Sequence, residues 1–90
     1  MSDEMPGTIS VFPIPANNEL NINFGNSLFS GNVTVQIFDM IGRQVMMKHL
    51  SVNSKGQISS IDISKLYLGS YIISVTSENG TEQKIKFLKD

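Results

Sequence analysis

The sequence predicts an all-β fold, an antiparallel β-sandwich of seven short strands. Apolar and polar side chains alternate in several short stretches, as they do in strands that bury one face. Glycine, asparagine and proline turn signals interrupt these stretches about every ten residues, and no stretch carries the apolar period of a helix. The 90 residues suffice for one domain with a thin core.

Composition and charge exclude several classes of protein. The chain has no cysteine, so it forms neither a disulfide nor a cysteine-based metal site. The formal net charge of −1 argues against nucleic acid as a partner, and no apolar run approaches the roughly 20 residues of a membrane-spanning helix. Residues 1–42 hold four acids and no base, whereas residues 43–90 hold seven bases and four acids. We expect residues 1–7 to be a linker or a start foreign to the domain, which then covers residues 8–90.

The first half of the domain predicts three strands. Residues 8–12 form a short strand that ends at Pro13 and Pro15, because proline has no N–H to donate to a ladder. This stiff Pro-x-Pro segment suits a crossing between two sheets. Residues 19–24 alternate between apolar and polar side chains, and residues 33–37 do so with an inward row of β-branched residues.

A tight turn follows the third strand. Asp39 comes first and Gly42 fourth, as in a type I turn followed by a left-handed residue. A three-residue loop pairs Asp39 with Arg43 and places Ile37 opposite Val45, so that apolar residues share one face. The remaining strands are expected over residues 44–50, 57–63 and 71–76, with a closing strand after the last glycine.

The last two strands form a hairpin whose register depends on its turn. Asn79-Gly80 suits a two-residue type I′ turn, but that turn would pair Ile73 with Lys86. A three-residue loop with Gly80 in the left-handed region instead pairs Ile73 with Ile85. We prefer the second register because it keeps apolar residues on one face.

A corner is expected just before this hairpin. Leu66, Gly69 and Tyr71 have the spacing of a tyrosine corner, in which the tyrosine hydroxyl bonds to nearby backbone where the chain changes sheet. The preferred register also places Tyr71 opposite Phe87.

No group of residues predicts catalysis or ligand binding. His49 stands alone at a strand end, while Asp39 and Asp62 are explained by a turn and by the outward face of a strand. The methionines are typical of gap-filling core residues, and no run of oxygen ligands resembles a calcium-binding loop. We therefore expect no catalytic, cofactor-binding or metal-binding residue.

The closing strand is both basic and apolar. Lys84 and Lys86 alternate with Ile85 and Phe87 and so point outward, and Lys89 is expected to extend this exposed basic row. Outward lysines commonly protect an edge strand from pairing with other chains. Recognition by a partner is the second interpretation, and the residues alone leave both open.

Four strings of the sequence resemble one known family in its own order. ISVFPIPANNELNI resembles the opening of the C-terminal sorting domain of the type IX (Por) secretion system, type A, which typically reads x-V-x-P-N-P-A-x-x-x-L-x-I. VQIFDMIGRQV, with Gly42 and Arg43, resembles the family's strand, D-x-x-G-[RK], strand signature. IDISKLYLGSYIISV resembles its L-x-x-G-x-Y-x-x-x-V signature, and EQKIKFLKD resembles its basic-apolar closing strand.

Three positions depart from the family's usual pattern. Ile14 stands where Asn is usual between the prolines, and Tyr67 stands where Pro is frequent before the glycine. Asp90 follows the lysine on which the family often stops. The first two positions fall in loops, where substitution is tolerated.

The resemblance implies that the domain is a sorting signal and not a catalytic domain. Members are Ig-like seven-stranded sandwiches at the C-terminus of larger cargo proteins, and they direct that cargo through the outer-membrane translocon. The implied partners are the translocon, its shuttle proteins, a cell-surface sorting peptidase and the upstream cargo domain. The implied locations are the periplasm in transit, then the cell surface or the medium.

A second class of function fits the same fold. An Ig-like accessory module of an extracellular enzyme, binding carbohydrate or a neighbouring domain, remains the alternative, because fold does not fix function. Our hypothesis for the sorting signal assigns translocon recognition to Lys84, Lys86, Lys89, Pro13 and Pro15. The isolated domain is expected to be a monomer or a weak edge-strand dimer.

Overall fold

The structure, a computed structural model, describes residues 9–25 and 29–90. The strands in the described residues are β1 (Ser10–Phe12), β2 (Glu19–Asn23), β3 (Gly31–Asp39), β4 (Gln44–Val52), β5 (Ile58–Asp62), β6 (Gly69–Ser77) and β7 (Glu82–Lys89). Residues 1–7, predicted to be a linker, lie outside the described residues.

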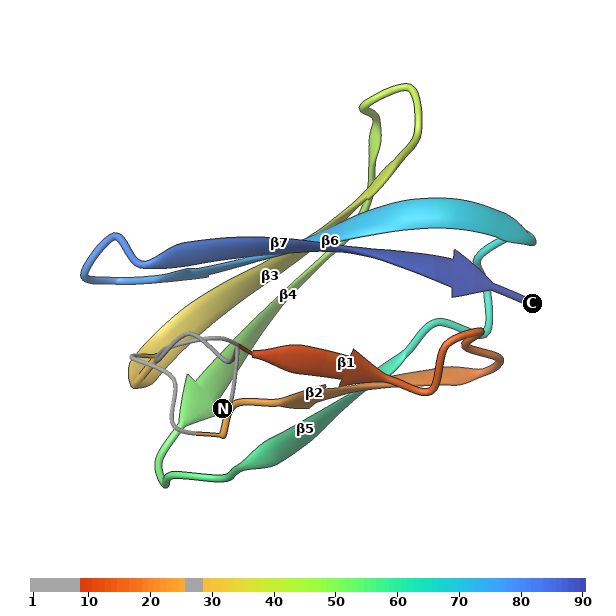
Figure 1. Cartoon of the computed structure of the whole chain (residues 1–90). Coiled ribbons are helices and arrows are strands. Elements are labelled where there is room, and N and C mark those ends of the chain that lie inside the picture. The colour runs from red at the N-terminus through yellow and green to blue at the C-terminus, as the bar shows by residue number, and fades with distance from the viewer. Residues whose placement is uncertain (1–8, 26–28) are drawn as a thin grey trace, which may run out of the picture.

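The strands form two antiparallel sheets that face each other (Figure 1). One sheet has the order β1-β2-β5, and the other has the order β4-β3-β6-β7. All neighbouring strands within each sheet run antiparallel. The predicted fold class, an all-β sandwich of seven antiparallel strands, is confirmed.

The core lies between the inward rows of the two sheets. These rows are Leu20, Ile22 and Phe24 from the first sheet with Ile61 and Ile63, and Val33, Val35, Ile37, Tyr71, Ile73, Val75 and Phe87 from the second. Each such side chain stabilises the fold by about 1.5–3 kcal/mol when it is fully buried. Phe29 closes one end of the core, where its ring meets that of Phe24 edge-on at 6.0 Å.

The register predicted for the last hairpin is confirmed. Ile73 pairs with Ile85, and Tyr71 pairs with Phe87. The Ser77 N–H donates to the carbonyl oxygen of Thr81 at 2.8 Å and closes the three-residue loop. Gly80 has a φ of 92°, which a side chain would disfavour.

The register predicted for the β3–β4 hairpin is wrong beyond its turn. The Asp39 N–H donates to the Arg43 carbonyl as expected, but Met46 rather than Val45 lies opposite Ile37. Val45 is the extra residue of a β-bulge. The bulge exchanges the two faces of β4, so Met46 packs on the core and Val45 is exposed. This face is the better one to bury because it continues to Leu50 and Val52, whereas the other continues to His49 and Ser51.

The Pro13–Pro15 segment crosses from one sheet to the other, as the sequence suggested. β1 pairs with β2 in the three-stranded sheet. Directly after the prolines, Ala16 forms an isolated parallel bridge with Lys89 of the four-stranded sheet. The chain then returns to the first sheet as β2.

The tyrosine corner predicted around Tyr71 is present where the chain passes from β5 to β6. The Tyr71 hydroxyl donates to the carbonyl oxygen of Tyr67 at 2.7 Å. Leu66 packs half-buried against the core, and Gly69 has a φ of 144°. On its other side, the Tyr71 ring stacks on Phe87 with centroids 5.7 Å apart, which ties the corner to β7.

Candidate functional site

The surface of β7 carries two of the lysines proposed for recognition. Lys84 and Lys86 are exposed and alternate with half-buried Ile85 and buried Phe87. Their outward placement therefore agrees with the alternation. Neither lysine forms an ion pair with another of the residues that the structure describes. Two unpaired positive charges thus lie side by side on one face of the strand.

Lys89 does not belong to this exposed row, and that expectation is wrong. Its side chain is 6% exposed, and its Nζ donates to the backbone oxygen of Asp90 at 3.3 Å. Residue 89 shares a face with residues 85 and 87, so the period of the strand directs it inward. A lysine at this place covers apolar surface with its methylene stem.

The proline crossing meets β7 at the C-terminal end of the strand. The Ala16 N–H donates to the Leu88 carbonyl at 2.7 Å, and the Asp90 N–H donates to the Ala16 carbonyl at 2.7 Å. Pro13 and Pro15 are exposed beside this junction. The structure thus brings the prolines to the end of the strand that holds Lys89, about 10 Å along the strand from Lys86.

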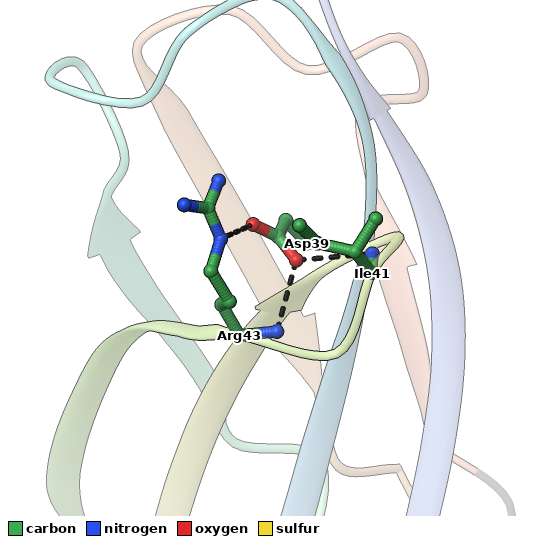
Figure 2. Close-up of polar contacts among 3 residues, drawn as sticks. All are labelled: Asp39, Ile41 and Arg43. Carbon is green, nitrogen blue, oxygen red and sulfur yellow. Dashed lines mark hydrogen bonds and ion pairs between the residues drawn. The ribbon is translucent and has the colours of Figure 1, made fainter.

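The β3–β4 hairpin projects beyond the rest of its sheet (Figure 1), and one carboxylate organises its tip (Figure 2). Oδ1 of Asp39 accepts the N–H groups of Ile41 and Arg43 at 3.1 and 2.9 Å, and Oδ2 accepts Nε of Arg43 at 2.8 Å. Gly42 in this turn has a φ of 90°. The hydrogen bond from the Arg43 N–H is the main reason why the pKa of Asp39 lies below its usual value.

This hairpin displays apolar side chains that the sequence did not single out. Met40 and Ile41 at its tip are 53% and 77% exposed. They occupy turn positions, where the backbone is set by Asp39 and side chains turn to solvent. The sequence feature that could have predicted this exposed apolar tip is an Asp-x-x-Gly turn with two large apolar residues at its central positions.

The described residues hold no arrangement that suggests chemistry. No three side chains of His, Cys, Asp or Glu come together there. His49 is exposed, with its Nδ1 3.3 Å from the Thr34 hydroxyl, beside a polar hollow of about 410 Å³ on the outer sheet face. Asp62 accepts the N–H of Ser64 at 2.9 Å, and hydrogen bonds from Ser64 lower its pKa. Within residues 9–25 and 29–90, no helix is long and apolar enough to cross a membrane.

Comparison with known proteins places the chain in a family. The family model described as "Secretion system C-terminal sorting domain" matches residues 10–89. The crystal structure of CopC from Methylosinus trichosporium OB3b is similar in fold, with a TM-score of 0.58 and 20% sequence identity over 92% of this chain and 94% of that one. At this identity the likeness concerns the fold alone. No curated protein matches the chain.

Proposed function

Because the chain belongs to the family of secretion system C-terminal sorting domains, the sorting signals of type IX secretion, we propose that it carries a larger cargo protein through the outer-membrane translocon. The cargo domain lies upstream, and shuttle proteins of the system bind the sorting domain. A cell-surface peptidase then removes the domain, and the cargo is released or anchored at the surface.

The observation that carries this proposal is the match over residues 10–89, which includes all seven strands in order. The family is one of sorting signals and not a catalytic family. Its presence implies export to the cell surface or the extracellular space, and we infer that the route passes through the periplasm. A signal of this kind acts through its surface, so the machinery must read exposed residues.

The exposed features favoured for this role are the lysines of β7. Lys84 and Lys86 are displayed without an ion-pair partner among the described residues. We also assign a part in recognition to Pro13 and Pro15, which are exposed at the C-terminal end of the same strand. Lys89 is left out of the surface because its side chain is buried.

The proposal is tested with a reporter in a host that has type IX secretion. A folded reporter with an N-terminal export signal is joined to residues 8–90, and its distribution among periplasm, cell surface and medium is measured. We expect the fusion at the surface or in the medium, and the same fusion in the periplasm of a strain without the translocon. The reporter with its export signal alone is the matched control.

One outcome would overturn the proposal. Retention of an intact, folded fusion in the periplasm of the secretion-competent strain would show that the domain is not a sufficient signal. The alternative of an accessory module would then be preferred.

A further inference from the structure

β7 is the outer strand of its sheet, and half of its backbone groups face away from that sheet. Residues in an antiparallel ladder alternate between bonding the neighbour and pointing to the other side. The hydrogen bond from Ser77 to Thr81 fixes the phase of this alternation. It follows that Gln83 and Ile85 bond β6, whereas Lys84 and Lys86 turn their N–H and C=O groups to the outer edge.

A contact at the C-terminal end of β7 agrees with this alternation. It also shows that the outward backbone groups of β7 can bond the backbone of another segment. The outward carbonyl of Leu88 accepts a hydrogen bond from the Ala16 N–H, and the Asp90 N–H donates one to the Ala16 carbonyl. This pairing is an isolated bridge. Towards the other end of β7, the Ile9 N–H bonds the side-chain oxygen of Gln83 instead of the backbone.

Between the Gln83 side chain, which binds the Ile9 N–H, and the Ala16 bridge, no backbone group of residues 9–25 and 29–90 pairs with this edge. The outward backbone groups of Glu82, Lys84 and Lys86 bond no other backbone group of residues 9–25 and 29–90. An extended segment laid along this stretch would gain main-chain hydrogen bonds of the kind that the Ala16 bridge already shows. Three consecutive outward positions span about 14 Å, enough for an added strand of four or five residues.

The positive charges of Lys84 and Lys86 beside this edge favour an added strand with acidic side chains. Lys84 and Lys86 are two residues apart, so their side chains lie on one face of the sheet about 7 Å from each other. In an added strand, every second side chain would lie on that same face, within about 4.5–5.5 Å of a directly opposite residue. Acidic residues at alternate positions would place a carboxylate next to each lysine.

From this geometry we propose that β7 binds an extended, acidic segment of a secretion-machinery protein by accepting it as a fifth strand of the four-stranded sheet. This inference rests on the proposed function and specifies how the signal is read. The backbone of residues 82–86 supplies the hydrogen bonds, and Lys84 and Lys86 supply the selectivity for acidic side chains. The Ala16 bridge marks the end at which the added strand stops.

A second copy of this chain is a poorer occupant of the edge. In the antiparallel register that sets Glu82 of one copy opposite Lys86 of the other, the two Lys84 side chains still face each other, and in the next register Lys84 faces Lys86. Like charges directly opposite each other destabilise a strand pair. The lysines therefore protect against self-pairing while they attract an acidic strand, and the two interpretations of the basic row are compatible.

The proposal is tested by binding of a defined peptide to the isolated domain. The probe is a nine-residue peptide of alternating glutamate and valine, acetylated and amidated, and binding is followed by NMR at low salt. We expect hydrogen exchange to slow at the amides of Glu82, Lys84 and Lys86, while the already bonded amides of Gln83 and Ile85 change little. A period of two along β7 is the mark of strand addition.

Two chemical controls separate strand pairing from charge attraction. A peptide with the same side chains but N-methylated at every second residue loses its donors, and we expect it to bind at least ten-fold more weakly. Among variants of the domain, Lys84→Ala and Lys84→Pro remove the same charge, but only the proline removes the outward N–H. Because this N–H is not part of the β6 ladder, a proline there is compatible with the fold.

We expect Lys84→Pro to bind at least ten-fold more weakly than Lys84→Ala, with Lys55→Ala unchanged from wild type. Thermal melts verify folding, and if Lys84→Pro does not fold, the N-methylated peptide decides. Equal binding of the methylated and unmethylated peptides would overturn strand addition, as would no binding of either. The reporter fusion is scored separately: normal export without peptide binding rejects this mode of recognition and leaves the sorting function standing, whereas loss of export rejects the function itself.

Discussion

The hydroxyl of Tyr71 donates a 2.7 Å hydrogen bond to the backbone oxygen of Tyr67, four residues earlier. This contact spans the corner at which the chain leaves the three-stranded sheet and enters the four-stranded one. Because the Tyr71 ring also stacks on Phe87, it connects the corner to the closing strand. Tyr71 thus links the β5–β6 connection to β7, which is also held by its ladder with β6.

Tyr71→Phe removes the hydroxyl and keeps the ring, so it tests the corner alone. We expect the free energy of unfolding to fall by about 1–3 kcal/mol, because a buried hydrogen bond is lost. Tyr67→Phe is the matched control: its side chain is 87% exposed and its carbonyl is retained, so a change below about 0.5 kcal/mol is expected. Chemical denaturation of both variants measures the difference, and equal midpoints would refute the corner.

Gly69 tests the backbone of the same corner. A Cβ at this position would meet nothing within 4 Å, so a side chain has room. Its φ of 144°, however, lies in a region that side chains disfavour. We expect Gly69→Ala to cost about 1–3 kcal/mol through backbone strain alone. An unchanged denaturation midpoint would mean that the corner relaxes at no cost.

The carboxylate of Asp39 gives the domain a dependence on pH. Its pKa is lowered in the folded state, chiefly by the N–H of Arg43, whereas an unfolded aspartate has a pKa of about 3.9. Between these two values the folded chain binds fewer protons than the unfolded one, so stability rises with pH. The advantage of wild type over Asp39→Asn should be complete above about pH 5 and shrink as the pH falls further.

Denaturation of both proteins between acidic and neutral pH measures this difference. Asp62, whose pKa is also lowered, is present in both proteins, so its contribution cancels. A difference that did not change with pH would show that the Asp39 contacts act without the charge.

Charge reversal of a lysine in the closing strand should cost more stability where the side chain is buried than where it is exposed. Lys89→Glu would place a carboxylate where the side chain is 6% exposed, and we expect a loss of about 1–3 kcal/mol. Lys86→Glu changes an exposed position on the same strand and should cost below about 0.5 kcal/mol. Thermal melts of the two charge reversals provide the comparison, and equal melting temperatures would contradict the inward position of Lys89.

Much of the fold was predictable because strand alternation is a local property of the sequence. The inward rows that end in Phe24, Ile37 and Val75 are buried as predicted. The register predicted for the last hairpin was also correct, because only one of the two registers placed Ile73 opposite an apolar partner. In these segments a single local pattern carried the information.

The errors arose where one local pattern competed with another. The Asp39 turn alone indicates a regular hairpin, which would turn Val45 toward the core. Leu50 and Val52 at the far end of β4, however, are on the opposite face and need to be buried. The bulge at Val45 accommodates both the turn and the burial of that face. Lys89 was grouped with the other lysines by charge, although strand period places it inward. The bridge from Ala16 to β7 joins distant segments, and no local pattern indicates it.

The most direct test of the account is export of cargo that carries a charge-reversed closing strand. Lys84→Glu with Lys86→Glu alters only exposed positions, and Lys55→Glu with Lys65→Glu makes the same change of net charge at exposed positions elsewhere. In the reporter fusion, we predict that the first pair abolishes passage to the surface and medium while the melting temperature of the domain is unchanged, and that the second pair is exported normally. Normal export of the first pair at the wild-type rate would contradict recognition through these lysines.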